Sequence, residues 1–420
     1  MGHDHSHSRP LPPTPPRIRR RLAYTIAPFI GLTLGFLLLL WPGGDGPLSG
    51  VDVELPPQFD GTVVGVEEGA CEAPPNTNFV CSVIEVRVET GADEGETFTF
   101  DQSVGAGSRT LAVDDPVVVA RGATDAQGAG GGEYYFVDYR RGAPLVALAL
   151  LFVVVVVAIS RLRGALSLLG LAISLLVLVR FVMPAILEGS DPVLVAVTGS
   201  AAIMFVTLYL AHGVNVRTTT AILGTLASLA LTGGLAIAFV EFARFTGFGS
   251  EEATFLQISA EQVNLEGLLL GGIIIGTLGV LDDVTVTQAS AVWELRVANP
   301  AYSFRRLYSS ALRIGRDHIA STVNTLVLAY VGASLPLLIL FTISSRPLGG
   351  ILTTEVVAEE IVRTLVGSIG LVASVPITTA LAAAVVSADP GTDESPPKEP
   401  PEDDDDSGFK VPKREAEWRD

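Results

Sequence analysis

The sequence predicts a mainly α-helical fold, a polytopic bundle of about eight transmembrane helices with a small all-β domain inserted after the first span. The 420-residue chain has a mean hydropathy of +0.48, with 49% hydrophobic and only 17% charged residues. Its apolar runs are too long for the core of one soluble domain. Between the first two runs, residues alternate between apolar and polar types, as they do in β-strands. We therefore expect a membrane protein with one domain outside the bilayer.

The distribution of charge excludes nucleic acid as a partner. The net charge is −18, and acidic residues outnumber basic ones by 18 to 5 in residues 42–143 and by 12 to 5 in residues 389–420. A nucleic-acid interface needs a basic face to neutralise phosphates, and neither segment supplies one. The expected partner is the lipid bilayer, with other membrane proteins or a second copy of the chain as further candidates.

The chain begins with a polar arm and a first apolar span. Residues 1–21 are rich in His, Pro and Arg, and we expect a disordered arm in the cytoplasm. Residues 22–41 are uncharged and long enough to cross a hydrocarbon layer of about 30 Å. A Trp-Pro pair ends this run instead of a small-residue cleavage site, which favours a retained helix over a signal peptide. Weak metal-ligand candidates in the flexible arm are His3, His5 and His7. No bound cofactor is expected.

Residues 42–143 are expected to form an extracytoplasmic all-β domain, an OB-like barrel or a sandwich. The segment contains alternating runs that are flanked by Gly, Pro, Asp or Asn. These runs are GTVVGVEE, CSVIEVRVET, ETFTFDQS, DDPVVVARG and EYYFVDYRR. About five strands in about 100 residues match the size of such a domain.

The two cysteines of the chain, Cys71 and Cys81, lie in this β segment and away from every apolar run. If the domain faces an oxidising space, a disulfide closing the loop between them is expected. The alternative is a pair of metal ligands. The segment contains no histidine, so it lacks the four soft ligands that a structural zinc site needs.

Residues 144–388 are expected to form a helical domain with seven spans, followed by a disordered acidic cytoplasmic tail at 389–420. Small residues and prolines interrupt several of the apolar runs, as membrane helices tolerate. The runs are 145–160, 164–184, 192–212, 218–241, 265–281, 318–342 and 363–387.

Arginines in the connections predict the orientation of the chain in a bacterial plasma membrane. Four arginines precede the first span, which places the amino terminus in the cytoplasm by the positive-inside rule. Alternation then puts the β domain outside, and the arginine-rich segment 296–317 falls inside. Both termini are therefore expected in the cytoplasm.

The stretch GTLGVLDDVTVTQASAVWEL begins as an apolar run and then meets Asp282 and Asp283. Upstream, the pairs Gly267 with Gly271 and Gly272 with Gly276 would let a neighbouring helix approach closely. Downstream, residues 285–288 fit a capping box at the start of a new, short amphipathic helix on the cytoplasmic surface. One interpretation of the aspartates is structural: they mark the point where the helix leaves the bilayer.

The other interpretation of this stretch is a proton or cation site. Adjacent carboxylates can share a proton, and oxygen donors suit hard cations. Ionisable groups at membrane depth are costly, and they are therefore candidates for function. An amide inside a span also needs a partner on a neighbouring helix. The candidate residues are Asp282, Asp283, Thr285, Thr287, Gln288 and Asn324.

The sequence resembles the YibE/F-like family of bacterial multi-pass membrane proteins. The resemblance covers about residues 20–388 and depends on GVLDDVTVTQASAVWEL, the Gly-rich run before it, the YYFVDYRR end of the β domain and the His-rich start. It implies the fold and the location in a membrane, but it assigns no activity and no site residues.

Three functions remain open. The first is a transporter or a transport-associated permease component with a polar pathway near the aspartates. The second is a membrane sensor or assembly factor whose outer β domain binds a ligand or partner. A membrane enzyme using a carboxylate-bound metal is third, and we expect no enzymatic activity because the sequence contains no recognisable catalytic motif.

Overall fold

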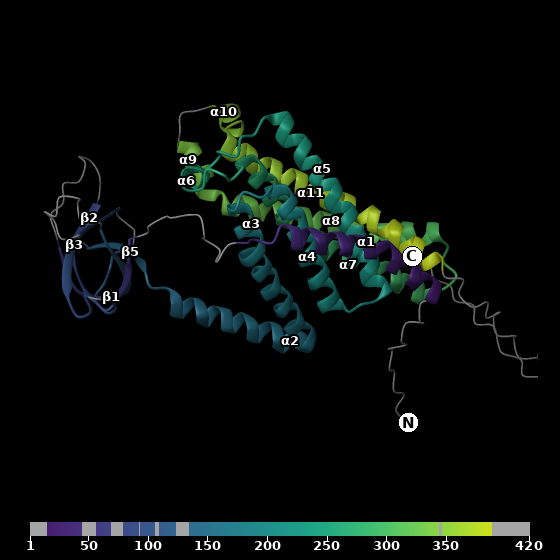
Figure 1. Cartoon of the computed structure of the whole chain (residues 1–420), viewed down its shortest axis with the longest axis horizontal. Coiled ribbons are helices and arrows are strands. Elements are labelled where there is room, and N and C mark those ends of the chain that lie inside the picture. The colour runs from purple at the N-terminus through teal and green to yellow at the C-terminus, as the bar shows by residue number, and fades with distance from the viewer. Residues whose placement is uncertain are drawn as a thin grey trace, which may run out of the picture.

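The structure is a computed structural model that describes residues 15–43, 56–68, 79–91, 93–105, 109–122, 134–343 and 347–388. The predictions for the amino-terminal arm with its three histidines, for Cys71 and for the acidic tail lie outside these residues. The described part is mostly helical, with a separate curled antiparallel sheet of five strands (Figure 1).

The β module, residues 58–139, contains the five predicted strands in one antiparallel sheet with the order β3-β2-β1-β4-β5. Alternate residues of the strands point to one side and bury an apolar core around Val63, Ile84, Val86 and Val119. The strands are β1 (Gln58–Glu68), β2 (Phe79–Val88), β3 (Thr97–Gly105), β4 (Pro116–Arg121) and β5 (Tyr134–Tyr139).

The sheet curls so that its edge strands β3 and β5 face each other. Phe98 of β3 stacks on Tyr134 of β5 with ring centroids 4.5 Å apart, and Phe100 stacks on Phe136 at 6.2 Å. Aromatic side chains therefore pack between the two edges. The predicted OB-like character of the domain stays a prediction.

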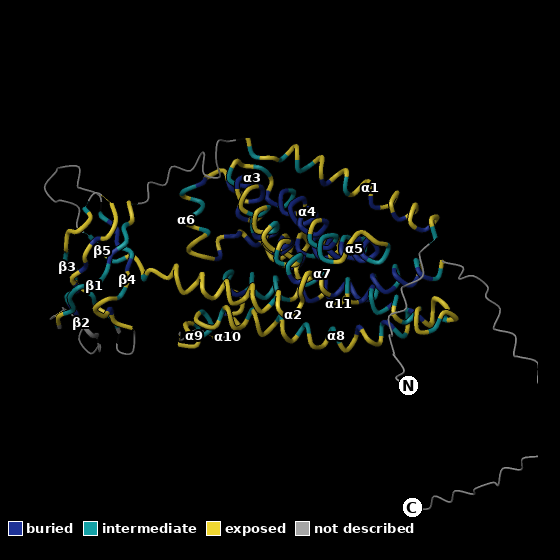
Figure 2. Tube along the Cα trace, turned by 90° about the horizontal axis from the view of Figure 1, so that it is seen from below, coloured by how far each residue is buried: buried dark blue, intermediate teal, exposed yellow. Residues whose placement is uncertain are grey.

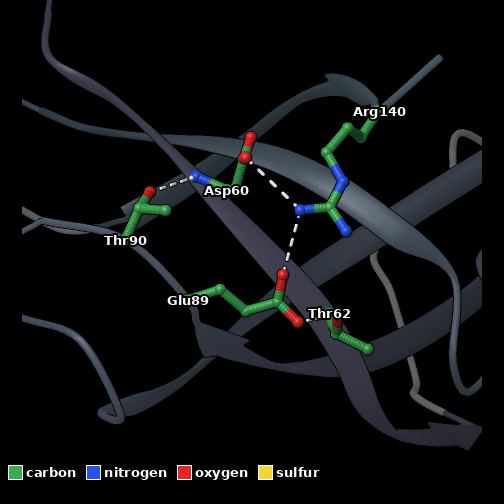
Figure 3. A network of polar contacts seen from close by, with 5 residues as sticks. All are labelled: Asp60, Thr62, Glu89, Thr90 and Arg140. Carbon is green, nitrogen blue, oxygen red and sulfur yellow. Dashed lines mark hydrogen bonds and ion pairs between the residues drawn. The ribbon is translucent and has the colours of Figure 1, made fainter. Parts of the chain in front are cut away.

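Arg140, directly after β5, ties the end of the sheet together (Figure 3). Its Nη1 lies 3.3 Å from Asp60 of β1 and 3.0 Å from Glu89. The Thr62 hydroxyl donates to Glu89 at 2.6 Å, and the Thr90 hydroxyl accepts from the Asp60 amide at 2.9 Å. This network fixes the point at which the chain leaves the sheet for the helix that begins at Gly142.

The remaining described elements are helical. They are α1 (Pro16–Leu39), α2 (Gly142–Val177), the π-helix η1 (Leu178–Val182), α3 (Met183–Leu187), α4 (Pro192–His212), α5 (Val216–Ala243), α6 (Glu251–Ser259), α7 (Leu265–Ala298), α8 (Phe304–Ala333), α9 (Leu335–Ile343), α10 (Leu348–Leu352) and α11 (Glu355–Ser387).

Helix α2 doubles back on itself at Arg161, where φ is 51° and ψ is −131° (Figure 1). A Cβ on Gly164 would lie 2.6 Å from the carbonyl oxygen of Val156, so only glycine permits the two arms to meet this closely. The predicted runs 145–160 and 164–184 correspond to these two arms. The first arm is exposed along nearly its whole length.

Helix α7 lies in the centre of the bundle and contacts α4, α5, α8 and α11. Figure 2 shows buried residues concentrated on α4, α5, α7 and α11. The predicted close approach at Gly267 and Gly271 is confirmed, since a Cβ there would lie 3.1 Å from Pro192 and 3.2 Å from Ala196 of α4. Gly272 and Gly276 face open space or the distant Tyr330 hydroxyl, so that part of the prediction is wrong.

Among the described residues, six helices are long and apolar enough to cross a membrane, and α8 with α9, bent by 60°, makes a seventh. One of the six is the 46-residue run Gly142–Leu187, which contains the break at Arg161. The beginning of α1 and the end of α11 lie at the same end of the bundle, and the β module lies beyond the opposite end (Figure 1).

Two predicted boundaries are wrong. The capping box at Thr285 does not start a new helix, because α7 continues without a break through the aspartates to Ala298. No glycine or proline interrupts residues 280–298, and the buried Val284, Gln288 and Val292 extend the packing face. The expected long loop 296–317 is also wrong. Most of it belongs to α8, which begins at Phe304 where Ser303 caps the helix through the Arg306 amide.

Candidate functional site

Asp282 lies in the middle of α7 against α5. The Thr225 side chain of α5 lies beside its carboxylate. The Thr225 hydroxyl donates to the Ala221 carbonyl at 3.1 Å and lies 2.7 Å from the Thr285 hydroxyl. Thr285 in turn donates to the Asp282 carbonyl at 3.2 Å. We call Asp282, Thr225 and Thr285 together the Asp282 site.

The Asp282 carboxylate is incompletely satisfied. The residue as a whole is half-buried, but its Oδ1 atom is fully buried and has no hydrogen-bond partner within the described part of the chain. A buried polar atom without a partner costs free energy, about 1–3 kcal/mol for a neutral group and more for a charged one. Such an atom in a native protein calls for an explanation, and a role in binding is one of the accepted ones.

The site lies well inside the bundle. Thr225 is about 14 Å from the start of α5 at Val216, at a rise of 1.5 Å per residue. Thr225 and Thr285 are both fully buried. The Asp282 carboxylate is therefore separated from the end of the bundle by more than two helical turns.

No cation among the described residues neutralises Asp282. None of the ion pairs between them includes it. Residues 218–240 of α5 and 364–387 of α11 contain no charged side chain, and neither do residues 192–211 of α4. On α8, Arg313, Arg316 and Asp317 are exposed, and the half-buried His318 has a buried Nε2 without a partner in the described part of the chain.

A comparison with protein families finds one that includes this site. The family profile described as YibE/F-like protein matches residues 148–388, which is more than half of the chain. The chain belongs to the YibE/F-like family. No curated protein and no solved structure matches it.

The YibE/F-like match begins inside α2 and ends with α11, so it includes the whole Asp282 site and leaves out α1 and the β module. Membership in the family therefore identifies the shared unit as the helical bundle. It does not identify a reaction or a substrate, because one fold can carry many different sites.

Gln288 is the second predicted candidate that the YibE/F-like bundle buries. Its Nε2 donates to the carbonyl of Ala311 on α8 and to the hydroxyl of Thr379 on α11, both at 2.8 Å. A Cβ on Gly315 would lie 2.8 Å from Gln288 Oε1, so glycine makes room for the amide. Gln288 links three helices and is nearly two turns away from Asp282 along α7, toward the end of this helix at Ala298.

Three predicted candidates do not belong to the Asp282 site. Asp283 is exposed and Thr287 is not among the buried residues of α7. Asp283 lies within electrostatic range of His212 at the end of α4. Asn324 is exposed on α8 and makes no hydrogen bond to any described residue, so the expected interhelical amide bond is absent there.

Thr225 was not predicted as a site residue, because nothing in the sequence distinguishes it from the other Thr and Ser residues of α5. The signal that could have found it is the stretch TTTAILGTLASLALTGG, in which hydroxyl and small residues recur at helical spacing. Such residues mark a helix face that packs closely against neighbours.

The metal and disulfide predictions remain untested. The described residues contain no cluster of three His, Cys, Asp or Glu side chains that could hold a metal ion. Cys81 lies in β2 and is not a free thiol, but Cys71 lies outside the described residues. The pairing of the two cysteines stays a prediction.

Proposed function

We propose that this YibE/F-like protein is a membrane transporter, or the permease component of a transport system, in which Asp282 binds and releases the ion that drives or accompanies transport. The main observation behind the proposal is that the Oδ1 atom of the Asp282 carboxylate is buried and has no partner among the described residues. This carboxylate lies inside a bundle of helices that are long and apolar enough to cross a membrane. Ionisable groups in such positions are expensive and mark ion or proton pathways. Transport, rather than an enzymatic reaction, is the activity that this chemistry supports.

The proposal includes a topology of eight spans with both termini in the cytoplasm and the β module outside. Three features support it. The break at Arg161 divides the 46-residue run into two arms, each long enough to span. The bent pair α8 and α9 supplies a further span. The last described helix ends at the same end of the bundle as α1 begins (Figure 1), as an even number of spans requires.

The test compares two neighbouring carboxylates. The purified full chain is reconstituted in liposomes, a potassium gradient with valinomycin sets the membrane potential, and proton and sodium movement are recorded with and without the protein. We expect wild type and Asp283→Asn to move one of these ions and Asp282→Asn to lose the movement. Asp283 is exposed and is the matched control.

Equal fluxes through Asp282→Asn and wild type would remove Asp282 from the pathway. Ion movement that does not exceed that of protein-free liposomes would overturn the transport proposal.

A sensor or assembly factor is the second candidate. The observation that favours it is the short link between the β module and the bundle, since β5 ends at Tyr139 and α2 begins at Gly142. Arg140 within this link pairs with Asp60 and Glu89 (Figure 3), so a force on the module would reach α2 directly. Breaking the network with Arg140→Gln should then change activity. An unchanged flux would argue against this candidate.

A further inference from the structure

Buried hydroxyl groups line the contact between α5, α7 and α11. We call this set the hydroxyl seam. All of its members are at most 4% exposed. They are Thr225, Ser228 and Thr232 of α5, Thr277 and Thr285 of α7, and Ser374, Thr378 and Thr379 of α11.

Most hydroxyls of the seam donate to a carbonyl of their own helix. Ser228 donates to Gly224, Thr232 to Ser228, and Thr379 to Val375, at distances between 2.6 and 2.8 Å. A hydroxyl that donates in this way keeps its oxygen lone pairs free to accept. The hydroxyl oxygens of the seam can therefore accept hydrogen bonds from a group or ion located between the helices.

Thr378 is the exception, because its hydroxyl is fully buried and has no partner among the described residues. It lies against Gly224 of α5, where a Cβ would come within 2.3 Å of Thr378 Oγ1. Gly224 is adjacent to Thr225, which faces α7 and Asp282. The adjacent residues Gly224 and Thr225 of α5 therefore lie against two different helices: Gly224 against Thr378 of α11, and Thr225 against α7, which carries Asp282.

The seam is too narrow for a solute larger than an ion. A Cβ on Gly370 would lie 2.0 Å from Thr232 Oγ1, and one on Gly367 would lie 3.1 Å from the Thr277 methyl group. Helices that pack on glycine at this distance leave no cavity for an organic substrate. The species that reaches Asp282 must be as small as a proton, a water molecule or a bare cation.

A proton fits the donors better than a metal cation. Hard cations in proteins take about six oxygen ligands, usually with more than one carboxylate. Here one carboxylate and two hydroxyls converge, and the hydroxyls of Thr225 and Thr285 are already 2.7 Å apart, which is hydrogen-bond distance. A proton on the Asp282 carboxyl removes the buried charge and turns the group into a donor.

No charged group of the surrounding helices pairs with Asp282 among the described residues. The charged and titratable groups on the same half of the surrounding helices are Arg217 at the start of α5, His212 at the end of α4, Asp283 on α7, and Arg313, Arg316, Asp317 and His318 on α8, and of these only Arg217 and His318 are partly buried. Helix α11 contributes no titratable side chain after Arg363.

We propose that the ion at Asp282 is a proton and that the hydroxyl seam, with Thr378 as a participating residue, is the path along which the proton travels. This inference rests on the proposed transport function and names its ion. A proton from water on one side forms an O–H bond with a carboxylate oxygen of Asp282, and the same bond breaks when water on the other side accepts the proton. No other reactant is needed.

The experiment uses Thr378→Val, which keeps the side-chain shape and removes the hydroxyl. Thr198→Val is the matched control: Thr198 is 3% exposed on α4, its hydroxyl donates to Leu194, and it lies outside the seam. In the liposome assay, we expect Thr378→Val to lower the potential-driven proton flux by about tenfold, the effect of losing one hydrogen bond worth about 1.4 kcal/mol in the transfer step. Thr198→Val should keep the wild-type flux.

The unfolding temperature of Thr378→Val distinguishes the loss of a proton path from a disturbance of helix packing. Removing an unpartnered buried hydroxyl should leave the unfolding temperature unchanged or raise it, so a flux loss cannot then be attributed to misfolding. Equal proton fluxes through Thr378→Val and Thr198→Val would overturn the role of Thr378. Sodium movement that depends on Asp282, without proton movement, would overturn the proton assignment and leave the transport proposal standing. If Asp282→Asn changes neither flux, Asp282 is not part of the pathway and this inference is overturned, whereas the transport proposal fails only if neither ion moves faster than in protein-free liposomes.

Discussion

At the scale of single residues, Asp282 and Asp283 have different surroundings although they are neighbours in the sequence. Successive residues of a helix are rotated by about 100°, so one carboxylate of a pair must point away from any surface that holds the other. Asp282 meets Thr225, whereas Asp283 is exposed. The sequence identified the pair but could not tell its members apart, because that requires knowing where α5 lies.

Gln288 gives a prediction at the same scale. Gln288→Ala removes two 2.8 Å hydrogen bonds and leaves a cavity where α7, α8 and α11 meet. We expect it to destabilise the protein by about 1–3 kcal/mol, measured by reversible unfolding in mixed detergent micelles. Thr287→Ala is the control, since Thr287 is not among the buried residues of α7 and its loss should change stability by no more than about 0.5 kcal/mol. Equal effects of the two variants would show that the amide does not hold the three helices together.

At the scale of elements, the sequence predicted most helices and all five strands, because hydropathy and alternation are local signals. It failed at the ends of α7 and α8. A capping box has the same residue types as a helix interior, and only the packing of Gln288 and Val292 against α8 and α11 decides that α7 continues. The arginine-rich stretch 304–317 was taken for a loop because its charges hide the apolar face formed by Leu307 and Ala311.

The contact between α5 and α11 depends on glycine. A Cβ at position 370 would lie 2.0 Å from Thr232 Oγ1, so Gly370→Ala must push the two helices apart. We expect a lower unfolding temperature and a loss of ion flux together. Gly279→Ala on α7 is the control: it meets nothing within 4 Å and gains helix propensity worth up to about 1 kcal/mol. A Gly370→Ala variant as stable as Gly279→Ala would show that the seam is looser than its contacts indicate.

The link between the β module and α2 should weaken in acid. The Thr62 hydroxyl and then the Arg140 guanidinium hold the pKa of Glu89 below its ordinary value. A carboxylate whose pKa is lower in the folded state adds stability above the ordinary pKa and loses it as the pH falls through the folded pKa. We therefore expect hydrogen exchange at β1 and β2 in the full chain, corrected for the intrinsic rate, to accelerate as the pH falls below about 4.5.

Arg140→Gln tests the origin of this effect. The variant should exchange faster than wild type at neutral pH and show a smaller additional change in acid, because Glu89 has lost a partner. Arg87→Gln is the control: it removes the same charge from an exposed arginine of β2 without breaking an ion pair between described residues, and the Arg87 charge lowers the Glu89 pKa less than Arg140 does. If both variants keep the acid response of wild type, the network does not determine it.

At the scale of the whole molecule, the number of spans depends on one residue. If Gly142–Leu187 crosses the membrane once, every later segment lies on the opposite side from the one proposed. The positive φ of Arg161, which breaks the helix, and the close approach of Gly164 to Val156 argue for two crossings. The hydropathy alone indicates a single long apolar run at residues 142–187. The two arginines at 161 and 163 were the sequence signal that divided it, because charged side chains are placed at the membrane surface.

Thiol labelling distinguishes the two topologies. With two crossings, Ser250 before α6 lies on the same side as the β module, and Ser303 before α8 lies on the other side. A membrane-impermeant maleimide added to intact cells should then label Ser250→Cys, while Ser303→Cys and Ser160→Cys should react only after the membrane is opened. The parent chain, labelled in parallel, gives the background from its own cysteines. A single crossing predicts the reverse for Ser250→Cys and Ser303→Cys. That result would move the start of α5 and the end of α7 to the face that carries the β module.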